Sequence, residues 1–310
     1  MPVLVQVLDL ASNLGSQRFD TDNGQATPCC CIAQAATFEP VVSPLSRLAT
    51  VITTTTTMGK GSSAAAALVG VTRSMGASEA LSAAHNFIGD VRSFDKTDPH
   101  LPTMIVFDLD DCLWTPEMHE LPGKPSVPIE GPLDPLDPEN SALGTMGMRA
   151  PSRRRGGWGI DDDGMYVRLF DGARLALREL ALDPRYRGIR LAAASSSLEP
   201  SYSYACLRGI EILPGLTLRN MFSYDQIGRS GRLTPRKTTH FRELHKESGI
   251  PYEEMLFFDD CNWGDHCEDV TRTFGVVSQR TPSGMRIEEF HRGLEKYRKV
   301  SERRMRDGGS

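Results

Sequence analysis

Short apolar runs that end in polar residues recur from residue 104 onward. Runs of four to six such residues are typical of buried parallel strands. Strands are predicted at 104–107, 166–170, 190–194, 221–224, 255–258 and 275–278. Helical spacing of apolar residues predicts helices at 76–92, 172–182, 237–248, 270–274 and 286–300. Strands that alternate with helices predict an α/β fold with a central parallel sheet, and residues 207–218 fit neither pattern clearly.

The first hundred residues differ from the rest in composition. They contain runs of threonine (Thr53–Thr57) and alanine (Ala64–Ala67) and few aromatic residues. Such a segment buries little apolar surface, so residues 1–100 are predicted to be a low-complexity, largely disordered extension. An organelle transit segment is an open alternative, although basic residues are sparse. A myristoylation pattern begins at Met58 and would matter only if translation started there.

A proline-rich stretch covers residues 115–165, which contain eight prolines. This density predicts an irregular insertion without regular helix or central strand. The stretch also holds a basic cluster (Arg153–Arg155) and an acidic one (Asp161–Asp163). The basic cluster could recruit a phosphorylated or acidic substrate, but a solvated loop is the favoured interpretation. The folded domain is expected at 101–300, followed by a disordered tail at 301–310.

Composition excludes several classes of protein. The 310 residues carry a net charge of −5, so a bulk nucleic-acid binder is not expected. No apolar run reaches the roughly 18–20 residues of a membrane span. Seven cysteines without zinc-site or secreted-framework spacing indicate reduced thiols in an intracellular, cytoplasmic protein, with organelle targeting left open.

Carboxylates follow two of the predicted strands. Asp108 and Asp110 follow residues 104–107 and stand two positions apart, which places them on the same face of an ideal strand. Asp259 and Asp260 follow residues 255–258. Clustered carboxylates are costly to bury without a cation, and Mg²⁺ prefers such oxygen ligands. A glycosyltransferase-type metal site and two solvated loop acids remain alternatives for the first pair.

The segment FDLDDCLW (107–114) resembles the first motif of the haloacid-dehalogenase-like phosphatases, especially the eukaryotic magnesium-dependent phosphatase-1 family. KTTHFRELHKESGIPYEEMLFFDD (237–260) extends the resemblance, which covers about residues 102–299. The resemblance implies a Rossmann-like three-layer α/β fold with a central parallel sheet. It also implies a flap after the first strand, which the proline-rich stretch would enlarge.

The resemblance also implies the catalytic roles. Asp108 would be the nucleophile that forms an aspartyl-phosphate, and Asp110 the general acid and base. Ser195, Ser196 and Lys237 would bind the phosphoryl group.

The same resemblance assigns the metal ligands. Mg²⁺ would be held by Asp108, by the backbone carbonyl of Asp110 and by Asp260. Asp259 is the alternative ligand, because adjacent strand residues face opposite ways. Asp265 is a further candidate.

Two positions depart from the family pattern. Cys112 stands where the first motif has threonine, and a thiol is a weaker hydrogen-bond donor. Ser196 stands where the family usually has arginine, and a hydroxyl cannot replace the bidentate grip of a guanidinium. A lower rate and weaker substrate binding are therefore expected. A redox role for Cys112 is less favoured than inert packing.

The predicted function is a Mg²⁺-dependent phosphatase that hydrolyses a phosphomonoester, either phosphotyrosine or a sugar phosphate. The substrate would be a phosphorylated small molecule or a phosphoprotein. One alternative is a catalytically weak relative that binds a phosphorylated partner. Another is a phosphomutase or dehalogenase on the same fold, although a dehalogenase would not need Asp110.

Overall fold

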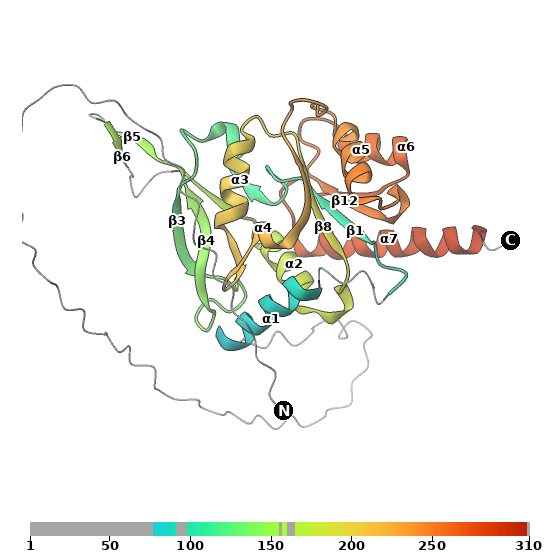
Figure 1. Cartoon of the computed structure of the whole chain (residues 1–310), viewed down its shortest axis with the longest axis horizontal. Helices are drawn as coiled ribbons and strands as arrows, with labels where there is room; N and C mark the ends of the chain where they lie inside the picture. The colour runs from blue at the N-terminus through green and yellow to red at the C-terminus, as the bar shows by residue number, and fades with distance from the viewer. Residues whose placement is uncertain (1–76, 91–97, 155–156, 160–164, 309–310) are drawn as a thin grey trace, which may run out of the picture. The chain divides into compact units, whose positions relative to one another are not determined.

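The computed structural model describes residues 77–90, 98–154, 157–159 and 165–308 (Figure 1). The chain divides into a unit at Met1–Ala64 and a unit at Ala65–Ser310, and all described residues belong to the second. The predictions for residues 1–76, for Asp161–Asp163 and for residues 309–310 lie outside the described part. Helix α1 (Ala77–Asp90) confirms the helix predicted at 76–92.

A parallel five-stranded sheet forms the centre of the described domain, in the order β11-β8-β1-β12-β13. Its strands are β1 (Met104–Phe107), β8 (Arg190–Ser195), β11 (Phe222–Ile227), β12 (Met255–Asp259) and β13 (Val277–Arg280). Phe107 at the end of β1 pairs with Phe258 on one side and Ala193 on the other. The carboxyl ends of β8, β1 and β12 therefore lie next to one another.

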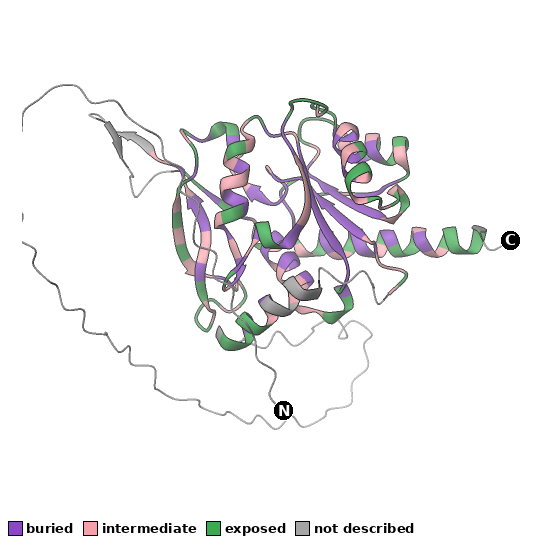
Figure 2. Ribbon diagram, in the orientation of Figure 1, coloured by how far each residue is buried: buried purple, intermediate pink, exposed green. Residues whose placement is uncertain are grey.

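Alternate residues of β1 face two separate cores. Ile105 and Phe107 belong to the core shared with α2 (Asp171–Leu182) and α7 (Ile287–Gly308). Met104 and Val106 belong to the other core, shared with α5 (Lys237–Ser248) and α6 (His266–Phe274). Figure 2 shows the sheet buried between these helices. The predicted three-layer α/β fold is confirmed.

The remaining elements fill the region that the sequence left unassigned. Residues 207–218 contain the end of α3 (Pro200–Gly209) and the pair β9 (Glu211–Leu213) and β10 (Leu216–Thr217). A short helix, α4 (Leu218–Met221), leads into β11.

The predicted disordered tail is wrong for residues 301–308, because α7 continues to Gly308. Ser301 is buried, and Arg304 donates hydrogen bonds to the carbonyls of Glu253 and Gly275. These contacts hold the last turns of α7 against the domain.

The prediction of an irregular stretch at 115–165 is also wrong. An antiparallel sheet in the order β2-β7-β4-β3 lies there, with β7 contributed from just after the stretch. Its strands are β2 (Trp114–Thr115), β3 (Val127–Pro132), β4 (Leu143–Arg149) and β7 (Tyr166–Leu169). Pro128 and Pro132 lie in β3, an edge strand, where a missing N–H is tolerated. A second pair, β5 (Ser152–Arg154) with β6 (Gly157–Gly159), contains part of the Arg153–Arg155 cluster.

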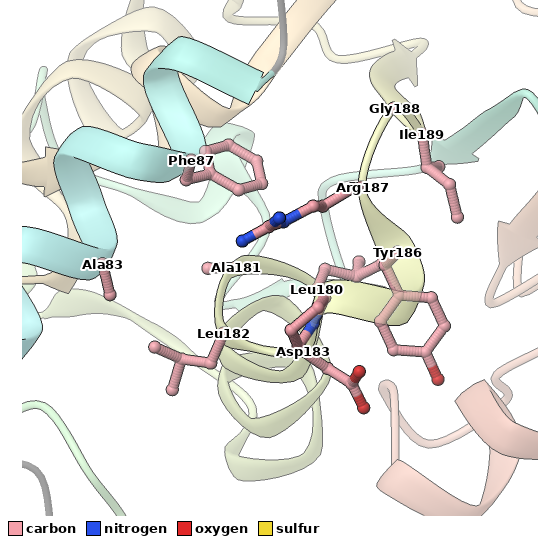
Figure 3. Close-up of a pocket in the computed structure, with 11 residues that line it drawn as sticks. Ala83, Phe87, Leu180, Ala181, Leu182, Asp183, Tyr186, Arg187, Gly188 and Ile189 are labelled. Atoms are coloured by element: carbon pink, nitrogen blue, oxygen red, sulfur yellow. The ribbon is translucent and has the colours of Figure 1, made fainter. Parts of the chain in front are cut away.

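A small pocket lies between α1 and the end of α2 (Figure 3). Phe87 and Arg187 face each other across it, and Gly188 and Ile189 close it just before β8. The pocket is therefore at the amino end of the sheet, away from the aspartates. Within the described residues, no helix is both long and apolar enough to cross a membrane.

Candidate active site

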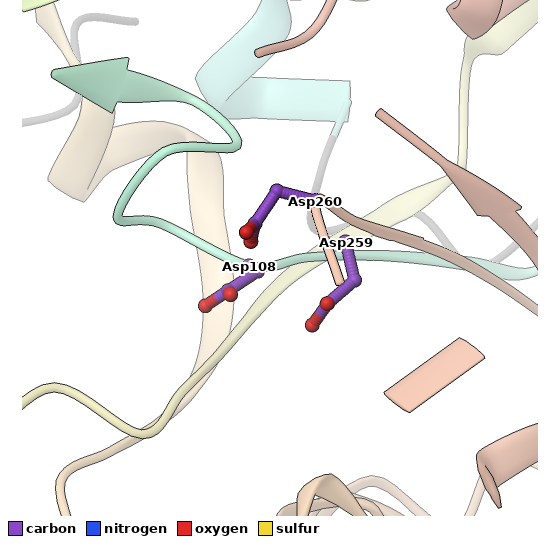
Figure 4. Close-up of side chains that lie close together, drawn as sticks. All are labelled: Asp108, Asp259 and Asp260. Carbon is purple, nitrogen blue, oxygen red and sulfur yellow. The ribbon is translucent and has the colours of Figure 1, made fainter. Parts of the chain in front are cut away.

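Three aspartates converge at the carboxyl ends of the central strand β1 and its neighbour β12 (Figure 4). Asp108 directly follows β1, Asp259 is the last residue of β12, and Asp260 comes next. One carboxylate oxygen from each lies within 4.8 Å of the other two, and all three residues are buried. We call Asp108, Asp259 and Asp260 the carboxylate cluster.

Lys237 places a single ammonium group in the carboxylate cluster. It begins α5 and is only 1% exposed. Its Nζ lies 2.5 Å from Asp108 Oδ1 and 3.2 Å from Asp259 Oδ2. The same Nζ donates a hydrogen bond of 2.8 Å to the carbonyl of Ala194 on β8.

The cluster is not electrically balanced by this lysine. Burial opposes the charge on Lys237, but the carboxylates of Asp108 and Asp259 outweigh it and raise the pKa of Lys237. Burial would also raise the pKa of Asp259, yet Lys237 and His266 hold it well below its ordinary value. Burial and the neighbouring Asp259 carboxylate raise the pKa of Asp260.

Burial and Lys237 also have opposite effects on the pKa of Asp108. Burial raises the pKa of Asp108 well above its ordinary value, although Lys237 opposes the shift. Three carboxylates with one ammonium leave net negative charge in a buried space. A divalent cation with oxygen ligands fits this donor set.

Asp110 lies beside the cluster and outside the three-carboxylate set. Trp114 Nε1 donates a hydrogen bond of 2.7 Å to Asp110 Oδ1. Burial raises the pKa of Asp110 to about 6, against hydrogen bonds from Trp114 and others. Asp111, the residue after Asp110, has a φ of 54°, which turns the chain sharply after β1. Burial thus makes Asp110 easier to protonate than an ordinary aspartate.

Ser195 and Ser196 lie at the carboxyl end of β8, as predicted. Ser195 is buried, and its carbonyl accepts from Gly228 N at 2.8 Å and lies 3.1 Å from His240 Nε2. The carbonyl of Ser196 accepts from Arg229 Nε at 2.6 Å. The polar end of β8 is therefore held by the segment that runs from β11 into α5.

Asp259 and Asp260 both contribute to the cluster, although adjacent strand residues were expected to face opposite ways. Asp260 lies beyond the end of β12, so strand alternation no longer applies to it. Asp259 Oδ1 accepts from Cys261 N, and Asp260 Oδ2 accepts from Asn262 N, each at 2.8 Å. The loop after β12 thus orients both carboxylates.

Asp265 is not part of the cluster. Its side chain caps the amino end of α6 by accepting from Glu268 N at 3.0 Å, and it pairs with Arg280. Proximity in sequence to Asp260 suggested a ligand, but the capping role occupies its carboxylate.

Cys112 is fully buried, and its thiol accepts a hydrogen bond of 3.4 Å from the Thr281 hydroxyl. Burial raises the pKa of the Cys112 thiol well above its ordinary value. The loop also receives support from Met285 N, which donates to the carbonyl of Cys112 at 2.9 Å. These contacts favour inert packing over redox chemistry at Cys112.

Three nearby residues were not recognised from the sequence as part of the site. His266 Nδ1 lies 3.4 Å from Asp259 Oδ1, Arg229 reaches Ser196, and the exposed Trp263 bonds Glu117. His266 follows the FFDD segment closely, which is a signal that was available. Arg229 lies in a loop whose fold against β8 no local pattern reveals.

Comparison with known proteins agrees with this geometry. Residues 100–300 match the profile of a family described as acid phosphatase, which is more than half of the chain. The chain belongs to this acid phosphatase family. The family match covers β1, β8, α5, β12 and the loops that follow the strands, and it includes every site residue described above.

Curated relatives of this acid phosphatase chain carry related names. A haloacid-dehalogenase-like hydrolase superfamily protein of Schizosaccharomyces pombe is 27% identical over 176 residues, which is 56% of this chain and 84% of the relative. Human magnesium-dependent phosphatase 1 is 26% identical over 200 residues, or 64% of this chain and 89% of the relative. The family resemblance predicted from the motifs is confirmed, and the chain is a haloacid-dehalogenase-like phosphatase.

Two solved structures are also similar to the chain. One is the N-terminal, phosphatase-containing part of a Bacteroides fragilis protein in complex with Mg, with a TM-score of 0.37 and 14% identity. The match covers 71% of this chain and 45% of that one. The other is a haloacid-dehalogenase-like protein of Streptococcus pneumoniae, with a TM-score of 0.29, 13% identity, and coverage of 41% and 53%.

Proposed function

We propose that this phosphatase hydrolyses phosphomonoesters with Mg²⁺ and forms an aspartyl-phosphate on Asp108. The observation that carries the proposal is the carboxylate cluster with Lys237 in contact with Asp108. A nucleophilic carboxylate needs to be ionised, and the ammonium at 2.5 Å favours that form against the opposing effect of burial. Both groups stand at the carboxyl edge of a parallel sheet, where α/β proteins bind their ligands.

The carboxylate cluster is the proposed metal site. Asp108 and Asp260 would hold Mg²⁺ with their side chains and Asp110 with its backbone carbonyl, while Asp259 is the alternative ligand. The oxygen-only donor set and its excess negative charge support this assignment. When bound, the ion supplies positive charge that offsets the phosphoryl oxygens and orients them for in-line attack.

The first half-reaction transfers the phosphoryl group to the enzyme. A carboxylate oxygen of Asp108 forms a bond to phosphorus while the bond from phosphorus to the ester oxygen breaks. Asp110 gives its proton to the departing oxygen. The raised pKa of Asp110, about 6, supports its role as the acid.

The second half-reaction restores the enzyme. Asp110, now ionised, takes a proton from water as the water oxygen bonds to phosphorus and the bond from Asp108 to phosphorus breaks. Inorganic phosphate leaves. Lys237 and the Ser195 hydroxyl would donate to phosphoryl oxygens in both steps, because they lie at the same sheet edge as Asp108.

The proposed substrate is a phosphotyrosine or a sugar phosphate, carried by a small molecule or by a protein. The name of the human relative, a magnesium-dependent phosphatase, supports the metal and the reaction but specifies no substrate. The proline-rich region between β2 and β7 would act as a flap beside the site.

Hydrolysis of p-nitrophenyl phosphate by the full chain tests the proposal. We expect turnover with Mg²⁺, none with EDTA, and none for Asp108→Asn, with a phosphorylated Asp108 peptide in acid-quenched wild-type protein. Asp265→Asn is the matched control, because Asp265 lies outside the cluster and should keep the activity. Turnover that survives Asp108→Asn would refute the mechanism. Phosphate binding without turnover would instead favour a catalytically weak relative.

A further inference from the structure

Three successive carbonyls at the end of β8 each contact a basic side chain. Lys237 Nζ donates to the carbonyl of Ala194 at 2.8 Å, and His240 Nε2 lies 3.1 Å from that of Ser195. Arg229 Nε donates to the carbonyl of Ser196 at 2.6 Å. The carbonyl that holds Arg229, that of Ser196, is therefore two residues further along the chain than the Ala194 carbonyl that holds Lys237.

The backbone before Arg229 is also fixed against β8. Gly228 N donates to the carbonyl of Ser195 at 2.8 Å, and Gly228 has a φ of 111°. A Cβ added at Gly228 would lie 2.8 Å from Pro200 Cγ, so the chain approaches the start of α3 closely. This approach requires glycine and positions Arg229 beside Ser196.

The charges of the site leave a role for this arginine. Lys237 already contacts two carboxylates of the cluster. Arg229 is exposed, and within the described part of the chain no ion pair joins it to an acidic side chain. Since Nε is engaged by Ser196, the two terminal nitrogens of Arg229 are the donors left for a ligand. A guanidinium binds two phosphate oxygens in parallel hydrogen bonds.

We propose that Arg229 binds the phosphoryl group of the substrate and supplies the guanidinium that is missing at Ser196. The proposal rests on the phosphatase function proposed above. Arg229 would reach the phosphate from the loop between β11 and α5, across the end of β8. Ser196 then serves through its carbonyl, which orients the arginine, and not through its short side chain.

Steady-state kinetics with p-nitrophenyl phosphate and inhibition by orthophosphate test this role. For Arg229→Ala we expect about a tenfold or greater rise in both KM and the inhibition constant of orthophosphate, as for loss of a charge-assisted hydrogen bond. Arg229→Lys should recover part of the loss. Ser196→Arg in the Arg229→Ala background should recover more, because it returns a guanidinium to the same strand end.

Arg232→Ala is the matched control, since Arg232 lies in the same loop and pairs with Glu243 at 3.6 Å. It should leave KM and orthophosphate inhibition unchanged. Unchanged constants in Arg229→Ala would overturn the proposal, as would equal losses in the Arg232→Ala control. Circular dichroism establishes that each variant is folded.

A separate measurement distinguishes failure of this proposal from failure of the proposed function. If the wild-type chain binds orthophosphate in calorimetry without any turnover, the catalytic proposal fails while Arg229 can still be tested. Weaker orthophosphate binding by Arg229→Ala would then support its role. Equal binding by both proteins would reject it.

Discussion

The indole Nε1 of Trp263 donates a hydrogen bond of 2.8 Å to Glu117 Oε1. This bond joins the loop after β12 to the segment after β2, although the Trp263 side chain is 76% exposed. Glu117→Ala and Trp263→Phe each remove the bond. An exposed bond of this kind contributes roughly 1 kcal/mol or less, so the free energy of unfolding should barely change.

The expected effect of losing this bond is local. Amide hydrogen exchange at residues 117–121 and 261–264 should become faster in both variants, because two loops are released from each other. Exchange rates equal to those of the wild-type protein would show that the bond does not restrain the loops.

Lys237 should be a large contributor to stability without metal. Lys237→Met leaves Asp108 and Asp259 buried without their shared cation. We expect a loss of about 3–5 kcal/mol in the free energy of unfolding, measured by urea denaturation in EDTA at pH 7. Adding Asp259→Asn to Lys237→Met should restore part of it, since one unpaired charge is removed.

Lys246→Met is the control for this series. Lys246 is exposed on the same helix, so its substitution should change stability by about 0.5 kcal/mol or less. Similar losses for the two methionine variants would mean that helix propensity, and not the buried charge, determines the effect.

His240 should make stability depend on pH. Burial lowers the pKa of His240 from 6.5 to about 4 in the folded state. The folded protein therefore disfavours the charged imidazole, and this contribution is fully present above pH 6.5 and is lost as the pH falls toward 4. The difference corresponds to about 3 kcal/mol.

The measurement compares wild-type protein with His240→Gln between pH 4 and 7. The comparison is needed because Asp110, whose pKa is raised to about 6, contributes with the opposite sign over much of this range. The wild-type advantage in free energy of unfolding should shrink as the pH falls. A constant difference would contradict the buried neutral state of His240.

The Cys261 thiol should react faster with alkylating reagents than the thiols of the buried cysteines. Burial raises the pKa of both Cys112 and Cys206, so neither forms a thiolate readily. Cys261 is half-buried, in the loop after β12. Iodoacetamide labelling followed by peptide mass spectrometry should modify Cys261 in the native protein. Cys112 and Cys206 should react only in urea, and early labelling of Cys112 would revive a redox role.

The central sheet could be predicted because strands that are buried on both faces consist of continuous apolar residues. Continuous apolar runs such as Met104–Phe107 fit strands with helices on both sides. In the antiparallel sheet, β7 was predicted as a strand, but β3 and β4 were missed because they are partly exposed and because the prolines of Val127–Pro132 resemble a loop. An edge strand tolerates proline, and edge position depends on tertiary pairing that no local window contains.

The site residues likewise divide into those that a local sequence pattern predicts and those whose position depends on tertiary contacts. Asp108 and Asp260 could be placed at one sheet edge because each follows a buried strand. Arg229 could not, since its position depends on Gly228 meeting Ser195 and Pro200. The capping of α6 by Asp265 likewise depends on where the chain leaves β12.

The prolines that made β3 hard to predict also affect whether the molecule can associate with other copies of itself through this edge strand. An edge strand offers unpaired backbone groups to any passing strand, which is a route to aggregation. Two of the six residues in β3, Pro128 and Pro132, have no N–H to offer. The strand pairs inward with β4 and is a poor template for a further strand. The composition that resembled a loop thus protects the sheet margin against edge-to-edge polymerisation.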